Sequence, residues 1–258
     1  MLARLAQRIA AIEALKGRTF VGANVLDSQI GALDVAADGS IRTDRDQPFI
    51  AVYTDVSKAD GQQDHLRALH RSGATDLTIE VGIAASMTEL HPETGETVIV
   101  GLGIPVTDPA MEFYLDCIGR QVVNALTDPR NAWAEVWRGL SSGINRVERR
   151  RASDATGVRI AAHQIVVNTD LLPDPVFGEP VAATSIWTKL LAQMEATNHP
   201  QREMVLSLIG DPDGVLEHEA QRRRFGMTLD EARALFDIAV EPGETTEPDV
   251  TSVTSERA

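Results

Sequence analysis

The chain of 258 residues has one cysteine, Cys117, few aromatic side chains and no long apolar run. A single cysteine excludes an intrachain disulfide framework and a thiolate metal cluster, which favours synthesis in the cytoplasm. The longest apolar run, 98–106, is far shorter than the ~20 residues of a membrane-spanning helix. Arg4, Arg8 and Glu13 interrupt the N-terminal segment where a signal peptide would be apolar. We therefore expect no membrane partner.

Positive charge is also scarce, because 24 Lys and Arg residues face 38 Asp and Glu residues and give a net charge of −14. Such a chain is not generally attracted to nucleic-acid phosphates or anionic lipids. Two cationic runs, 146–151 and 221–225, could contact phosphate, but neither has aromatic residues interleaved with its arginines. We interpret both runs as salt-bridged faces or subunit contacts.

Recognisable catalytic patterns are missing as well. The histidines show no HExxH spacing, and the glycines of 101–105 lack the third glycine and the lysine of a phosphate loop. Ser141, Ser142 and Ser185 have no nucleophile-elbow context, and Cys117 lies beside an apolar stripe, as a core residue does. We expect no catalytic, cofactor-binding or metal-binding residue and hence no enzyme.

The clearest strand signal is PFIAVYTD at 48–55, which offers apolar or β-branched side chains to both faces of a sheet. Residues 77–84 alternate strictly, with Leu77 and Ile79 on the apolar face. An antiparallel meander is the simplest connection between these strands. Other elements are also expected: helices at 2–15, 109–127 and around 132–140; strands at 19–27, 98–105 and 157–168; a surface loop at 32–47 and a charged turn at 145–151.

These patterns predict an α/β (α+β) fold, a mostly antiparallel mixed sheet flanked by helices, over residues 1–172. Three prolines within 172–180 then mark an irregular arm. Apolar residues at helical spacing and a capping box from Thr228 to Glu231 predict a helical extension over 173–240. The polar residues 241–258 lack the apolar content of a core, and we expect them to be disordered.

The elements follow one another as a helix, TFVGANVLD, a polar loop, PFIAVYTD, a polar insert, DLTIEVGIA, a capped helix, an arginine-containing turn and GVRIAAHQIVVN. This order resembles that of the tail-terminator proteins of long-tailed bacteriophages, including the lambda type. The resemblance covers about residues 1–172. The chain is longer than the compact members of that family, and residues 173–258 have no counterpart in the pattern.

The resemblance implies a structural virion protein in the tail-neck region, made in the host cytoplasm. It would form a homo-oligomeric ring, a hexamer, that caps the tail tube and stops its polymerisation. Its partners would be its own copies, the tail-tube protein and a head-completion or connector protein, and DNA would pass through the lumen without specific binding. No cofactor is implied. We expect assembly contacts at Asp55, Lys58, Asp60, Asp64, Arg149, Arg150 and Arg151.

Two other functions remain open at this stage. The first is another ring-forming head-completion or neck protein on a related fold. The second is a small-molecule enzyme whose site has no recognisable sequence pattern.

Overall fold

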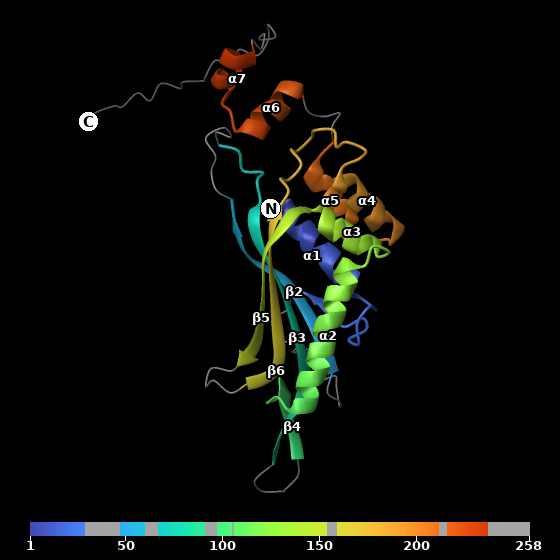
Figure 1. Ribbon diagram of the computed structural model, residues 1–258. Helices are drawn as coiled ribbons and strands as arrows, with labels where there is room; N and C mark the ends of the chain where they lie inside the picture. Colours follow the sequence, from blue (N-terminus) through green and yellow to red (C-terminus); the bar gives the residue numbers. More distant parts are fainter. Residues whose placement is uncertain are drawn as a thin grey trace, which may run out of the picture.

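A computed structural model describes residues 1–28, 47–59, 67–90, 97–104, 106–153, 159–211 and 216–236. It has an α+β fold in which helices α1, α2 and α3 lie along one face of a mixed sheet (Figure 1). The elements are α1 (Leu2–Leu15), β1 (Val25–Asp27), β2 (Gln47–Lys58), β3 (Gly73–Leu90), β4 (Thr97–Gly103), α2 (Pro109–Thr127), α3 (Ala132–Gly139), β5 (Ser141–Ser153), β6 (Arg159–Leu171), α4 (Ile186–Ala196), α5 (Arg202–Ile209), α6 (Glu217–Phe225) and α7 (Leu229–Phe236).

The main path of the sheet runs β1-β2-β3-β6-β5, and β4 pairs with the far half of β3. Of the described strand pairs, only β1–β2 is parallel, so the expected mostly antiparallel sheet with a β2–β3–β4 meander is confirmed. The central strand of the path is β3, although PFIAVYTD, in β2, gave the clearest strand signal in the sequence. The reason is that β6, which is remote in sequence, pairs with the other side of β3 over residues 73–82.

The core lies between the sheet and the helices. The predicted alternation in β3 is confirmed, because Leu77, Ile79, Val81 and Ile83 are all buried on the helix-covered face. The stripe of α2 packs on them through Leu115, Ile118, Val122, Ala125 and Leu126. Phe49 to Val52 are fully buried, as expected for a strand with two apolar faces.

Local signals in the sequence set the helix ends. Asp108 accepts a hydrogen bond of 2.8 Å from the N–H of Met111 at the start of α2, and Pro109 follows as the first helical residue. The first helix ends at Leu15, and Gly17 adopts a positive φ of 67° just beyond it. At the start of α7, the N–H of Thr228 donates to Glu231 and the N–H of Glu231 donates to Thr228 Oγ1, as a capping box requires.

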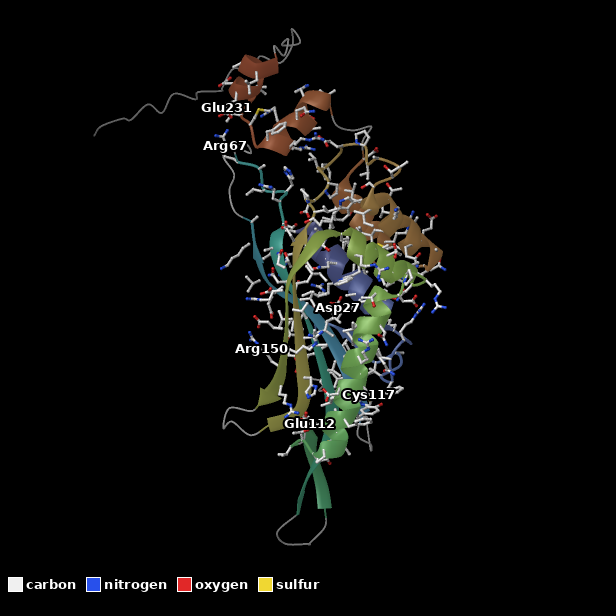
Figure 2. All side chains as sticks on the ribbon, viewed as in Figure 1. Asp27, Arg67, Glu112, Cys117, Arg150 and Glu231 are labelled. Atoms are coloured by element: carbon white, nitrogen blue, oxygen red, sulfur yellow. The ribbon has the colours of Figure 1, made fainter. Side chains whose placement is uncertain are left out.

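Helices α4 and α5 contribute Trp187, Leu190, Met194, Val205 and Ile209 to the same buried cluster as the sheet. The preceding residues, 172–180, are irregular, as their prolines predict. Helices α6 and α7 lie further out, where Arg67 pairs with Glu231 (Figure 2).

Two expectations about local structure were wrong. The strand expected at 19–27 is only Val25–Asp27, because a turn closed by a 2.8 Å hydrogen bond from the N–H of Gly17 to the carbonyl of Gly22 occupies the preceding residues. The cationic segment 145–151 is not a turn but part of β5, where pairing with β6 satisfies its backbone. The expected loop at 32–47, except Gln47, and the expected tail at 241–258 lie outside the described residues.

Candidate assembly surface

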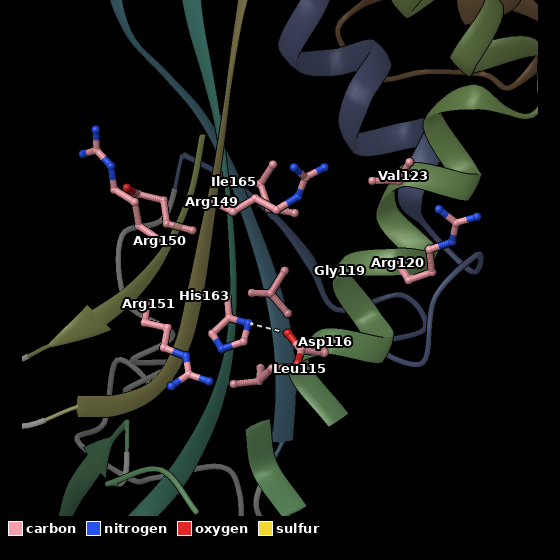
Figure 3. Close-up of a pocket in the computed structure, with 12 residues that line it drawn as sticks. Leu115, Asp116, Gly119, Arg120, Val123, Arg149, Arg150, Arg151, His163 and Ile165 are labelled. Carbon is pink, nitrogen blue, oxygen red and sulfur yellow. Dashed lines mark ion pairs between the residues drawn. The ribbon is translucent and has the colours of Figure 1, made fainter. Parts of the chain in front are cut away.

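The three consecutive arginines of β5 divide between the two faces of the sheet. Arg149 and Arg151 pair in register with Ile165 and His163 of β6 and point toward α2. Arg150 points the other way (Figures 2 and 3) and forms an ion pair with Glu148 of its own strand. This separation follows from the period of two in a strand, so only Arg149 and Arg151 face the helix side.

A groove of about 490 Å³ lies on the helix side between α2, β5 and β6. Its apolar lining comes from Val81, Leu115, Val123 and Ile165, and its charged lining includes Asp116, Arg120, Arg149, Arg151 and His163 (Figure 3). We call this feature the α2–β5 groove. An apolar lining bordered by several cations is suited to binding an acidic, partly apolar segment or an anionic ligand.

Glu112, at one end of the α2–β5 groove, connects the helix to the strands. Its carboxylate lies 2.8 Å from Arg151 Nη2 and 3.0 Å from His163 Nε2, and it accepts a 2.8 Å hydrogen bond from Thr107. Burial alone would raise the pKa of Glu112, but the hydrogen bonds from Thr107 and His163 and the charge of Arg151 outweigh it. The net result is a lowered pKa. Glu112 is therefore held as a carboxylate that fixes Arg151 in place.

Arg120 and Arg149 differ from Arg151, because neither lies within ion-pair distance of a carboxylate in the part of the chain that the structure describes. Asp116, the acid nearest to them in the lining, is 73% exposed and lies 3.6 Å from His163 Nδ1. The groove therefore retains two cations that a bound molecule could neutralise. The net charge of the chain is −14, so the charge of these two arginines is opposite in sign to the charge of the whole chain.

The strand that borders the groove is also an edge of the sheet. β5 ends the strand order, so one side of its backbone has no strand partner among the described residues. Two apolar side chains on this strand, Ile144 and Val147, are 54% and 41% exposed. An edge strand with exposed apolar side chains is a ready site for pairing with another chain.

No described helix covers the opposite face of the sheet (Figure 1). This face carries the buried pair Phe49 and Ala51 and, beside it, a polar group around Tyr53. Gln164 donates to Tyr53 Oη at 3.2 Å, and Tyr53 donates to Glu80 at 3.3 Å. Burial is the main cause of a raised pKa for both Tyr53 and Glu80; the hydrogen bond from Tyr53 partly offsets it at Glu80. Glu80 therefore lies on this face without a described cationic partner.

The other predicted contacts do not join the groove. Asp55 is exposed on the uncovered face and accepts a 3.2 Å hydrogen bond from Thr78, and Lys58 lies exposed at the end of β2. Asp60 and Asp64 lie outside the described residues. Arg149 and Arg151 come together in the groove as one site. Arg150 also borders the groove, but its side chain points away from α2 (Figure 3), and Asp55 and Lys58 lie elsewhere.

Sequence reasoning missed Arg120 and His163, which line the groove, and Glu112, which contacts Arg151 and His163. A signal for Arg120 was present, since it follows Asp116 by four residues and both therefore lie on one side of α2. His163 could have been placed by the alternation with Ile165 in its strand. Nothing in the sequence placed α2 beside β5, because that neighbourhood depends on the strand order.

The described residues contain no group of three His, Cys, Asp or Glu side chains placed to hold a metal ion. Cys117 is partly buried on α2. Within the same residues, no helix combines the length and the apolar character needed to cross a bilayer. No protein-family model matches the chain, and no curated protein matches it significantly. A functional proposal therefore rests on the sequence and on the α2–β5 groove.

Proposed function

We propose that this protein is a structural component of a phage virion, an oligomeric ring that caps the completed tail tube, ends its polymerisation and offers a surface for head joining. The observation that carries the proposal is the edge of the sheet at β5, which has no strand partner on its outer side among the described residues. This edge combines the exposed Ile144 and Val147 with the cationic α2–β5 groove. These are the features of a surface built for a protein partner.

The order of the elements gives a second line of support. A first helix, the antiparallel strands β2 and β3, the capped helix α2 and a late strand β6 occur in the order on which the resemblance to tail terminators depends. All the helices that pack on the sheet lie on one face (Figure 1). Among the described residues, no helix covers the opposite face and no strand pairs with the outer side of β5, so both surfaces can contact neighbouring molecules.

The partners in this proposal are other copies of the chain in a ring, taken as a hexamer, the tail-tube protein on one side and a head-completion or connector protein on the other. DNA passes through the lumen without being bound specifically. A net charge of −14 suits this role, because a lumen that held phosphates tightly would slow a passing genome. In this proposal the protein acts in the virion, at the junction of tail and head.

The proposal is tested by electron microscopy of the purified protein, alone and with assembled tail tubes. Rings with a central hole, or density confined to one end of each tube, are expected. Because a ring contact of modest area is strengthened when several neighbours hold a subunit at once, assembly on the tube end can exceed assembly in solution. Compact monomers that neither form rings nor bind tube ends would contradict the proposal.

The volume of the α2–β5 groove favours one alternative function. A cavity of about 490 Å³ is within the range of small-molecule sites. Arg120 and Arg149, which have no ion-pair partner in the part of the chain that the structure describes, suit an anionic ligand. A rise in melting temperature with small anionic metabolites, lost in Arg149→Ala and retained in Arg150→Ala, would support ligand binding in place of assembly.

A further inference from the structure

Positive charge is concentrated on the strand at the border of the sheet. Four of the six residues 146–151 in β5 are arginines, and one is a glutamate. Over this stretch β5 pairs with β6 without a break in register, and a register shift lies on either side of it. No described strand pairs with the outer side of β5 (Figure 1). Residues 146–151 are therefore a regular, cationic piece of sheet edge, which we call the arginine edge.

The described carboxylates offset only part of this positive charge. Glu148 serves two arginines at once: one carboxylate oxygen lies 3.0 Å from Arg146 Nε, and the other pairs with Arg150. These two arginine side chains remain 57% and 62% exposed. Arg149 has no ion-pair partner in the part of the chain that the structure describes. The arginine edge can therefore accept further negative charge on both faces of the sheet.

The charge of the arginine edge limits which strands can pair with it. A second copy of β5 would bring four further arginines to the contact, and like charges directly opposite one another destabilise a strand pair. Charged side chains commonly protect edge strands in this way. The same arginines favour a strand of opposite charge, because opposite charges across a strand pair stabilise it. Nucleic acid is also anionic, but a net charge of −14 opposes its approach to this chain.

The alternation of β5 determines which side chains an added strand would meet. Val147 and Arg149 lie on the helix side of the sheet, and Arg146, Glu148 and Arg150 lie on the other side. Directly opposite side chains in neighbouring strands have Cβ atoms about 4.5–5.5 Å apart, so each position selects its partner. An apolar side chain suits Val147, which is 41% exposed, and an acidic one suits each arginine. A second acid opposite Glu148 would be repelled.

We propose that the arginine edge binds an extended acidic segment of a partner protein by strand addition, as a further strand beside β5. The segment carries acids opposite Arg146, Arg149 and Arg150. It carries an apolar residue opposite Val147 and an uncharged residue opposite Glu148. This inference rests on the proposed function for its biological setting, and it states the chemistry that a partner brings to the β5 edge.

Two short, end-capped peptides test this pattern. TEETVE, read from its N-terminus, lies opposite residues 151 to 146 in an antiparallel pair, and EVTEET lies opposite 146 to 151 in a parallel pair. The threonine opposite Arg151 is uncharged because Glu112 already pairs with that arginine. The control peptide ETETEV has the same composition, but no register places its glutamates opposite Arg149 and Arg150 together.

Fluorescence anisotropy of the labelled peptides, with protein up to millimolar concentration at low salt, measures binding. TEETVE or EVTEET should bind at least about tenfold more tightly than ETETEV, because only the former can pair both adjacent arginines. Added salt should weaken the binding, since it screens exposed charges. No binding of either probe, or binding no tighter than that of the control peptide, overturns the inference.

A charge exchange locates the contact. Arg149→Glu with Arg150→Glu should lose the probe that the wild type binds, and it should bind instead the same peptide with lysines in place of its two adjacent glutamates. Arg130→Glu with Lys189→Glu changes the net charge equally, on exposed side chains at the cavity between α3 and α4, and should bind as the wild type does. Melting curves check that each variant is folded. Equal losses in the two variants would place the contact outside the arginine edge.

Amide hydrogen exchange separates strand addition from attraction between charges alone. New hydrogen bonds from an added strand should slow exchange within residues 146–151 when the probe is bound, and the control peptide should leave exchange there unchanged. Binding without slower exchange would mean that the peptide is held by charge and adds no strand, which contradicts the proposal.

Two further outcomes decide between partners and between proposals. Oligothymidylate that binds in place of the peptides, and is lost in the Arg149→Glu, Arg150→Glu variant, would assign the edge to nucleic acid and overturn the inference. The peptide experiments use purified protein only. Failure of the probes with tails still capped therefore contradicts this inference alone, whereas binding of the probes by a protein whose absence leaves tails unchanged contradicts the proposed function alone.

Discussion

The carboxylate of Asp174 accepts a 2.7 Å hydrogen bond from the N–H of Ala3, 171 positions earlier in the chain. It also accepts a 3.0 Å bond from the N–H of Leu2, pairs with the N-terminal ammonium and receives a 3.2 Å bond from Ser72. Helix α1 has no side-chain cap of its own at Met1. Asp174 therefore supplies the missing cap and fastens the segment after β6 to the first helix.

Replacement of Asp174 by alanine should lower the free energy of unfolding by about 1–3 kcal/mol, since the N–H groups of Leu2 and Ala3 lose their acceptor. Urea denaturation measures the change. The control is Asp230→Ala, whose side chain is 94% exposed and which should cost no more than about 0.5 kcal/mol. Equal effects of the two substitutions would show that Asp174 is not a cap.

Replacement of Ile79 by aspartate should prevent folding. Ile79 is fully buried between Val52 and Ile165 in the sheet, and a carboxylate there would lose its hydration without gaining a partner, at a cost of several kcal/mol. Val56→Asp, on the same sheet but 48% exposed, should give folded protein. Circular dichroism distinguishes the folded variant from the unfolded one. A soluble Ile79→Asp protein with an unchanged melting transition would show that Ile79 is not buried in β3.

His199 makes stability depend on pH. Burial lowers the pKa of His199 below its ordinary value of 6.5, and the nearby charge of Glu13 only partly offsets this effect. The unfolded chain then takes up the proton at a higher pH than the folded chain does. The contribution of this group is therefore complete above about pH 6.5 and decreases as the pH falls below that value. Melting temperatures from pH 7.5 to 5.5 should fall less steeply in His199→Gln, and an unchanged slope would count against this assignment.

Removal of residues 241–258 should leave the melting temperature unchanged. The reason lies in composition, because proline, threonine and acidic residues dominate the segment and cannot build a core. Calorimetry of a chain that ends at Val240 provides the measurement. A large drop in melting temperature would mean that the segment packs on the folded protein.

Local patterns predicted most of the elements because each pattern has a local cause. The apolar alternation from Leu77 to Ile83 fixes which face of β3 is buried, and Asp108 with Pro109 fixes where α2 begins. Phe49 is buried on the other face of the sheet against Gly82, a contact that the sequence did not indicate. A side chain at Gly82 would come within 2.6 Å of the ring of Phe49, so the glycine makes room for it.

The α2–β5 groove could be predicted only in part. The sequence run 149–151 pointed to the arginines of the groove. Because this run was predicted to be a turn, the alternation of side chains in a strand was not applied to it. Arg150 was therefore grouped with Arg149 and Arg151. Arg120 and Glu112 reach the site through the packing of α2 on β6, a contact between elements far apart in sequence. Such contacts depend on strand order, which local patterns do not encode.

The central claim, that this protein ends tail growth, is tested most directly by the length of tails in a phage that lacks the gene. Electron micrographs of such lysates should show abnormally long tubes without heads, because nothing stops polymerisation. Supplying the wild-type protein should restore normal length and head joining. Tails of normal length already joined to heads in the mutant would contradict the claim.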